Sequence, residues 1–179
     1  WENHYIGSNG SACLVSVDGT DFLINEPIPF SEKWFSHKLK HAGLRYEVAI
    51  CIQTGWIVWT HGPFPAGDWP DLNIARNALI YELDEGEFYV ADGGYYDGHQ
   101  WSVTPNGLHD FSDRQRAVVR ARHETMNSRF KYWAVLRNKW RHPREKHGLV
   151  FEAVANITQY VILDGEESVF AVDYDESEF

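Results

Sequence analysis

Sulfur-containing residues are scarce in this chain of 179 residues, which has two cysteines and one methionine. A pair of cysteines cannot supply the disulfide framework of a small secreted domain or a four-cysteine zinc site. Cys13 and Cys51 both lie in apolar, strand-like runs, so we expect two buried thiols in a reducing compartment. The nine histidines show no zinc-ligand spacing either.

Long apolar runs are also missing, since no stretch approaches the roughly 20 residues that cross a bilayer. We therefore expect no contact with a membrane. The hydrophobic share of 44% and the charged share of 23% are typical of a globular domain. Because the chain starts at Trp1 and not at Met, we expect an N-terminally incomplete domain over residues 1–163. An acidic C-terminal tail follows at residues 164–179.

Basic residues are few outside one segment. The formal net charge is −10, which taken alone argues against binding nucleic acid. However, eleven of the sixteen Lys and Arg lie within residues 114–146, where Glu124 and Glu145 are the only acids. This distribution predicts a local basic surface for nucleic acid on an acidic body. A solvated helix face that pairs with acids elsewhere on the surface remains the alternative.

Apolar periodicity predicts an alternation of strands and helices. The expected strands span residues 12–17, 45–52, 56–60 and 88–91, and the second and third form a hairpin. The expected helices span residues 68–83, 112–140 and 149–163, and Ser112 with Gln115 resembles a capping box. A short strand at residues 169–172 is a further expectation. The order predicts an α/β fold with a mixed central sheet flanked by helices, as in the ribonuclease-H-like fold.

Three acids stand at positions that suit a metal site. Asp18 and Asp92 each follow an apolar strand and precede glycine, and Glu124 lies in the long helix. Each has an ordinary explanation alone: a turn for the two aspartates, and an ion pair with Arg120 for Glu124. Together, two strand-end acids and one helical acid would hold two Mg²⁺ or Mn²⁺ ions for phosphodiester cleavage.

The long helix carries cations beside Glu124. At about 100° per residue, Arg120, Glu124 and Lys131 fall within roughly 40° of one another. That face would place an acid on the metal between two phosphate-binding cations. We also assign Arg122 and Arg129 to the DNA-backbone-binding set. His123 we interpret as an ordinary surface or groove histidine.

Asp71 is a fourth candidate metal ligand. It lies in the first turn of the expected crossover helix, between the hairpin and the strand at 88–91. An acid in that turn stabilises the helix dipole without any metal. The sequence leaves open whether Asp71 binds metal or only stabilises the start of the helix.

Four short motifs resemble a known family. They are SVDGTD at 16–21, PAGDWPD at 65–71, ADGGY at 91–95, and RARHE at 120–124 continuing to Lys131. In this order they resemble the DDE superfamily endonucleases, the catalytic domains of PIF/Harbinger and related insertion-sequence transposases. The resemblance covers roughly residues 11–163. The helical signature of that family places a Tyr where this chain has Ala117.

The resemblance implies a ribonuclease-H-like fold and a catalytic triad of Asp18, Asp92 and Glu124, with Asp71 as an associated metal-site acid. It implies that Arg120 and Lys131 bind the DNA backbone near the scissile phosphate. The implied reaction is Mg²⁺- or Mn²⁺-dependent cleavage at transposon ends followed by strand transfer, in the nucleus. The implied partners are transposon-end and target DNA, a separate DNA-binding domain or partner protein, and in some arrangements a second copy of the chain.

Two other functions remain open at this stage. A domesticated transposase can keep the fold as a catalytically silent module that binds DNA or protein. A related nuclease could act on RNA or on RNA–DNA hybrids. The positions of the carboxylates of Asp18, Asp92 and Glu124 are the observation that bears most directly on the choice.

Overall fold

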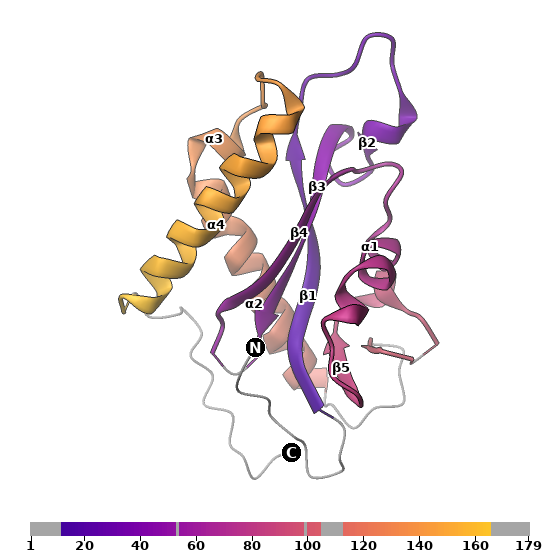
Figure 1. Cartoon of the computed structure of the whole chain (residues 1–179), viewed down its shortest axis with the longest axis vertical. Coiled ribbons are helices and arrows are strands. Elements are labelled where there is room, and N and C mark those ends of the chain that lie inside the picture. The colour runs from indigo at the N-terminus through magenta and orange to yellow at the C-terminus, as the bar shows by residue number, and fades with distance from the viewer. Residues whose placement is uncertain (1–11, 53, 99, 105–112, 166–179) are drawn as a thin grey trace.

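The computed structural model describes residues 12–52, 54–98, 100–104 and 113–165, with the side chains of the long helix described from Ala121 onward. The described elements form a mixed α/β arrangement around one sheet (Figure 1). The sheet has six strands: β1 (Ala12–Leu23), β2 (Phe35–Ser36), β3 (His41–Cys51), β4 (Ile57–Pro65), β5 (Glu87–Val90) and β6 (Ser102–Val103).

The centre of the sheet is β1. It pairs antiparallel with β3, which pairs antiparallel with β4, and on its other edge it pairs parallel with β5. β6 extends the parallel half beside β5, and β2 adds a short pairing to β3. The antiparallel half and the parallel half therefore meet at β1, as the sequence predicted for a mixed sheet.

Helices cover both faces of the sheet. Figure 1 shows α1 (Asp71–Asn77) on one side, and α3 (Ala134–Arg137) and α4 (His147–Leu163) on the other. The long helix α2 (Asp113–Tyr132) contacts both β1 and α4, so it belongs to the side of α3 and α4. Alternate residues of β1 therefore face two different layers.

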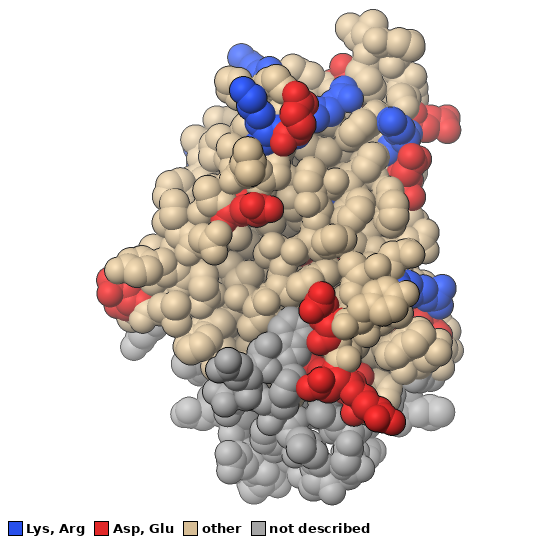
Figure 2. Space-filling view, viewed as in Figure 1, with Lys and Arg blue, Asp and Glu red and all other residues tan. Residues whose placement is uncertain are grey.

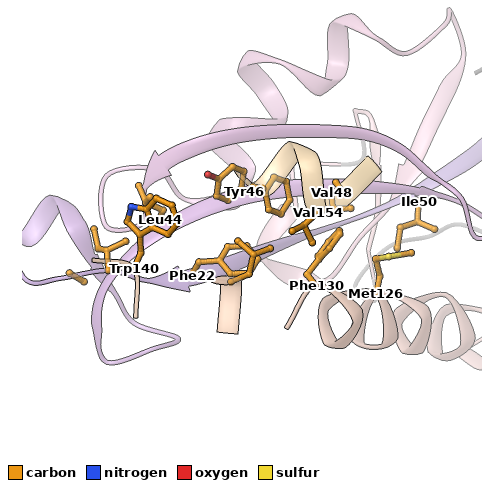
Figure 3. Close-up of a cluster of buried hydrophobic side chains, with 14 of the residues drawn as sticks. Phe22, Leu44, Tyr46, Val48, Ile50, Met126, Phe130, Trp140 and Val154 are labelled. Atoms are coloured by element: carbon orange, nitrogen blue, oxygen red, sulfur yellow. The ribbon is translucent and has the colours of Figure 1, made fainter. Parts of the chain in front are cut away.

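The layer beneath α2 and α4 is aromatic. Phe22 of β1 packs against Tyr46 of β3 with ring centroids 5.8 Å apart, and Phe151 of α4 stacks on Tyr46 at 3.9 Å. Figure 3 shows this cluster between the strands and the helices. The phenol of Tyr46 also hydrogen-bonds Nδ1 of the buried His147 at 2.6 Å. This layer fixes α2 and α4 on the sheet by burying large apolar surface.

The layer beneath α1 is smaller and more polar. Its apolar part is formed by Val17 of β1, Ala75 of α1 with Leu79 just after it, and Tyr89 of β5 with Tyr95 just after it. α1 is shorter than the predicted helix at 68–83, because the backbone leaves helical geometry at Ala78, where φ is −140°. A separate 3-10 helix follows at Leu79–Tyr81.

The prediction that the first strand ends in a turn at Asp18 is wrong. β1 continues to Leu23, and its pairing with β3 runs without interruption from Val15 to Leu23. The backbone hydrogen bonds of Asp18, Gly19 and Thr20 are therefore used in the sheet and not in a turn. Asp18 thus projects from the middle of a strand.

Other expectations are mostly confirmed at the level of elements. The hairpin of β3 and β4, the strand β5 and the helix α4 occur close to their predicted positions. The long helix ends earlier than predicted, at Tyr132, and β2 and β6 were not predicted. Ser112 and residues 169–172 lie outside the described residues. No helix in the described part of the chain is long and apolar enough to span a membrane.

Candidate functional site

A cleft of about 420 Å³ opens where β1, β5 and α2 meet. Among its lining residues are all three acids of the predicted triad, Asp18, Asp92 and Glu124, together with Lys131. The remaining lining residues come from the same strands and helix and from the β2–β3 connection: Ser16, Val17, Lys38, Val90, Ala91, His123, Asn127 and Ser128. The fold therefore brings the sequence-predicted acids to one concave surface.

Strand register explains why the two aspartates meet. Ser16 of β1 lies beside Val90 of β5 in the parallel pairing, and Asp18 and Asp92 each follow two residues later. Neighbouring strands lie about 4.8 Å apart, so the two side chains leave adjacent backbones at the same level of the sheet. β5 ends at Val90 while β1 continues, which opens space above Asp92.

Each aspartate is oriented by one hydrogen bond. The side-chain amide of Asn127 donates to Oδ2 of Asp18 at 3.1 Å, which ties α2 to β1 at the site. The backbone N–H of Gly94 donates to Oδ1 of Asp92 at 2.8 Å, so Asp92 caps the 3-10 helix at Gly93–Tyr95. Both carboxylates are half-buried, whereas Glu124 is exposed.

One face of α2 supplies the helical side of the cleft. Glu124, Asn127, Ser128 and Lys131 recur at the spacing of a single helix face. The prediction placed Glu124 and Lys131 on this face, and both line the cleft. Asn127 and Ser128 were missed, although the same spacing would have found them. The side chain of Arg120 lies outside the described residues.

The assignment of Arg122 to the DNA-binding set is wrong. Its side chain is buried, with 5% of its surface exposed, and its guanidinium donates to the backbone carbonyl of Ile52. Two residues along a helix rotate the side chain by about 200°, which turns Arg122 away from the face of Glu124. Arg129, the remaining member of that set, is half-buried.

His123, interpreted from the sequence as a surface or groove histidine, lines the cleft but is buried. It is 4% exposed, and its Nε2 lies 2.8 Å from Oγ of Ser16 on β1. Burial lowers the pKa of His123 to about 4, so the ring is neutral at physiological pH. The His123–Ser16 contact holds α2 against β1 two residues before Asp18 and directly before Glu124.

Lys38 is a cleft residue that the sequence did not indicate. It comes from the β2–β3 connection, is exposed, and donates from Nζ to the backbone carbonyl of Gly19 at 2.8 Å. This contact places a cation next to Asp18, on a segment with no motif of its own. The cleft therefore carries two lysines, Lys38 and Lys131, besides its three acids.

Asp71 lies outside the cleft. It begins α1, and its Oδ1 lies 3.1 Å from Nη1 of Arg45. A Cβ added to Gly19 would lie 2.3 Å from the same oxygen, so the carboxylate packs directly on the backbone of β1. Burial raises the pKa of Asp71 to about 6, against the opposing effect of Arg45. The structure thus places Asp71 on the α1 face of β1, among buried charges.

Those buried charges form a connected group with Arg45 at its centre. Nε and Nη2 of Arg45 donate to the two oxygens of Asp21 at 2.7 and 2.9 Å, and Ser36 donates to the same carboxylate at 2.5 Å. Glu47, two residues along β3, is fully buried. Burial, with a smaller effect of Asp71, raises the pKa of Glu47 to about 9, so Glu47 is neutral at physiological pH.

The donor set of the cleft fits a hard divalent cation in chemistry. Carboxylate oxygens from three separate elements are the ligands that Mg²⁺ and Mn²⁺ prefer. In the described part of the chain, no three Asp, Glu, His or Cys side chains are already close enough together to hold one ion. Binding would therefore need the carboxylates of Asp18, Asp92 and Glu124 to move closer together.

The two cysteines are both free and half-buried, less enclosed than the sequence predicted. They take no part in the cleft.

Comparisons of the chain with protein-family models, with curated proteins and with solved structures give no match. The functional assignment therefore rests on the geometry of the cleft and on the residues that line it.

Proposed function

We propose that this chain is the catalytic core of a divalent-metal-dependent DNA endonuclease of the transposase type. The observation that carries the proposal is the cleft, which gathers Asp18, Asp92 and Glu124 from three elements far apart in sequence. The placement of Lys131 on the same wall, seven residues after Glu124, adds support. A mixed sheet with helices on both faces agrees with a ribonuclease-H-like fold, which forms part of the proposal.

The residues of the cleft would divide the work by their chemistry. Asp18, Asp92 and Glu124 would hold two Mg²⁺ or Mn²⁺ ions, which when bound activate a water or a 3′-hydroxyl and stabilise the leaving oxygen. Lys38 and Lys131 would bind phosphate oxygens on either side of the acids. Asn127 would orient Asp18, and the His123–Ser16 contact would keep the helix and the strand in register.

Asp71 has no direct role in this scheme. Its carboxylate lies beside Arg45 on the other face of β1, so we propose that it supports the strand that carries Asp18. Strand transfer into target DNA, action in the nucleus and assembly with a DNA-binding domain or partner protein are further parts of the proposal. They rest on the resemblance of the sequence motifs alone.

Nicking of supercoiled plasmid DNA tests the proposal. We expect the chain to convert supercoiled plasmid to open circles with Mn²⁺ or Mg²⁺, and to stop in chelator. Asp92→Asn should lower the rate at least about a hundredfold, because it removes a charged ligand from the metal site. Asp68→Asn, at an exposed turn outside the cleft, is the matched control and should nick like the parent chain.

Two results would contradict the proposal. One is a nicking activity that Asp92→Asn leaves unchanged, which would point to a contaminating nuclease. The other is DNA binding of equal affinity with Mn²⁺ and with chelator, with no cleavage of DNA, RNA or hybrid substrates. That second result would favour a catalytically silent binding module that keeps the fold.

A further inference from the structure

A second hollow, of about 670 Å³, lies at α3 and the segment that follows it. Its walls are α3, with Ala134 and Val135, and the segment that follows it, with Asn138, Lys139, Arg141 and His142. Trp140 lies between these residues and forms part of the lining. None of these residues lines the cleft of Asp18, Asp92 and Glu124.

The hollow is held in place by Trp140. This residue is 6% exposed, and its backbone N–H donates to the carbonyl of Leu23, at the end of β1, at 2.8 Å. Its indole N–H donates to the carbonyl of Pro143 at 3.1 Å, which fixes the segment on both sides of Arg141. The hollow is therefore preformed, and it is attached to the strand that carries Asp18.

The electrostatic character of the hollow differs from that of the whole chain. Lys139 and Arg141 are exposed, and Arg137, Arg144 and Lys146 lie close to them in the sequence, with Glu145 as the one acid within residues 134–146. Among the residues that the structure describes, neither Lys139 nor Arg141 has an acid within ion-pair distance. Figure 2 shows blue side chains gathered over the end of the molecule where α3 leads into α4.

We propose that this hollow binds the phosphate backbone of a DNA duplex, as a contact region separate from the cleft. Lys139 and Arg141 would pair with phosphates, Asn138 and His142 would offer further hydrogen-bonding groups, and the exposed Val135 would face the sugars. A cationic rim on an otherwise acidic chain suits a polyanion. The inference rests on the proposed function, since it takes the substrate to be DNA.

β1 connects the acids of the cleft to the hollow, because Trp140 is hydrogen-bonded to Leu23 at the end of that strand. Asp18 and Leu23 lie five positions apart on β1, which is about 17 Å at about 3.4 Å per residue. A duplex rises about 3.4 Å per base pair, so this length of β1 corresponds to about five base pairs of duplex.

Fluorescence anisotropy with a labelled duplex of about 24 base pairs tests the proposal in chelator, between about 0.05 and 0.2 M salt. In the double variant Lys139→Ala/Arg141→Ala we expect about tenfold weaker binding. The salt slope, which is the slope of the logarithm of the binding constant against the logarithm of the salt concentration, should be smaller in magnitude by about two. Lys139→Arg/Arg141→Lys keeps both charges and should restore the slope. Arg76→Glu, on the exposed face of α1, changes the net charge by the same amount and should leave the slope unchanged.

An unchanged affinity and salt slope in the double alanine variant would overturn the proposal. So would an equal loss in Arg76→Glu, because net charge alone would then explain the effect. The test is independent of catalysis. If the double alanine variant binds DNA normally while Asp92→Asn abolishes nicking, only this inference fails. If it loses binding while no form of the chain nicks DNA, only the proposed activity fails.

Discussion

The two faces of β1 carry charges of opposite character. On the α1 face, Asp21 and Glu47 are buried, and the half-buried Arg45 joins Asp21 and Asp71 through hydrogen bonds and short ion-pair contacts. On the α2 face, Asp18 is half-buried and opens into a cleft beside Asp92 and the exposed Glu124. β1 therefore contributes Asp21 to an internally paired group of charges in one layer, and Asp18 to a solvent-facing group in the other.

This difference separates charges that hold the fold from charges that can meet a ligand. A buried ion has lost its hydration, so it depends on its partner, and removing that partner costs a large part of the stability. A solvent-facing carboxylate in a cluster of like charges contributes little to stability and gains most when a cation binds. The predictions below test whether the two faces of β1 follow this division.

Removal of Arg45 should have the largest effect. Arg45→Ala leaves the buried Asp21 carboxylate without its two guanidinium bonds, which we expect to cost about 3–5 kcal/mol of unfolding free energy. Urea denaturation followed by tryptophan fluorescence measures the change. Arg76→Ala, on an exposed helix face, is the control and should stay within about 0.5 kcal/mol. A loss below about 1 kcal/mol for Arg45→Ala would contradict the claim that the charges on the α1 face hold the fold.

Glu47 should make stability depend on pH. Its folded pKa of about 9 exceeds the ordinary value of 4.5, so the folded chain binds more protons than the unfolded chain between these values. Stability should therefore fall as pH rises from about 5 to 9, by roughly 1 kcal/mol per pH unit. Glu47→Gln cannot titrate and should fall less steeply. Denaturation curves at several pH values measure the difference, and parallel slopes would contradict the assignment.

Gly19 should be intolerant of even a methyl group. A Cβ would lie 2.3 Å from Oδ1 of Asp71, so Gly19→Ala must displace that carboxylate from Arg45, at a cost of about 1–3 kcal/mol. In an Asp71→Ala background the same substitution should cost about 1 kcal/mol less, because the clash is gone. Additive losses in the double variant would show that Asp71 does not press on β1.

Glu124 should have the smallest effect on stability. Because its side chain is exposed, Glu124→Gln should keep the unfolding free energy within about 0.5 kcal/mol. The parent chain should gain thermal stability with millimolar Mn²⁺, and Glu124→Gln should lose that gain. Glu152→Gln, exposed on α4, is the matched control. An equal Mn²⁺ response in all three proteins would remove Glu124 from the metal site.

The sequence predicted that the acids of the cleft come together, but it did not predict the length of β1 or the position of Lys38 beside them. Asp18 and Asp92 follow apolar runs that become neighbouring parallel strands, so local pattern was enough to bring them together. It was not enough to show that β1 continues past Asp18, because that depends on pairing with β3 at a distance in the chain. The position of Lys38 in the cleft depends on the same long-range pairing, so no local sequence pattern predicted it.

Errors on α2 and α1 have different causes. Arg122 was assigned by its charge, although its rotation of about 200° from Glu124 already placed it on another face. The burial of His123 could not be read from charge or spacing, since it depends on Ser16 lying opposite. Asp71 was left open between two roles, and only the position of Arg45 and Gly19 shows that it belongs to the buried charges.

The most direct test of the account is a crystal structure of the chain soaked in Mn²⁺, with anomalous diffraction to locate the metal. We predict Mn²⁺ between the carboxylates of Asp18 and Asp92, with Glu124 turned in from α2 to complete the site, and no Mn²⁺ beside Asp71. Full occupancy elsewhere with an empty cleft, or Mn²⁺ bound between Asp71 and Glu47, would contradict the division between the two faces of β1 and the proposed function with it.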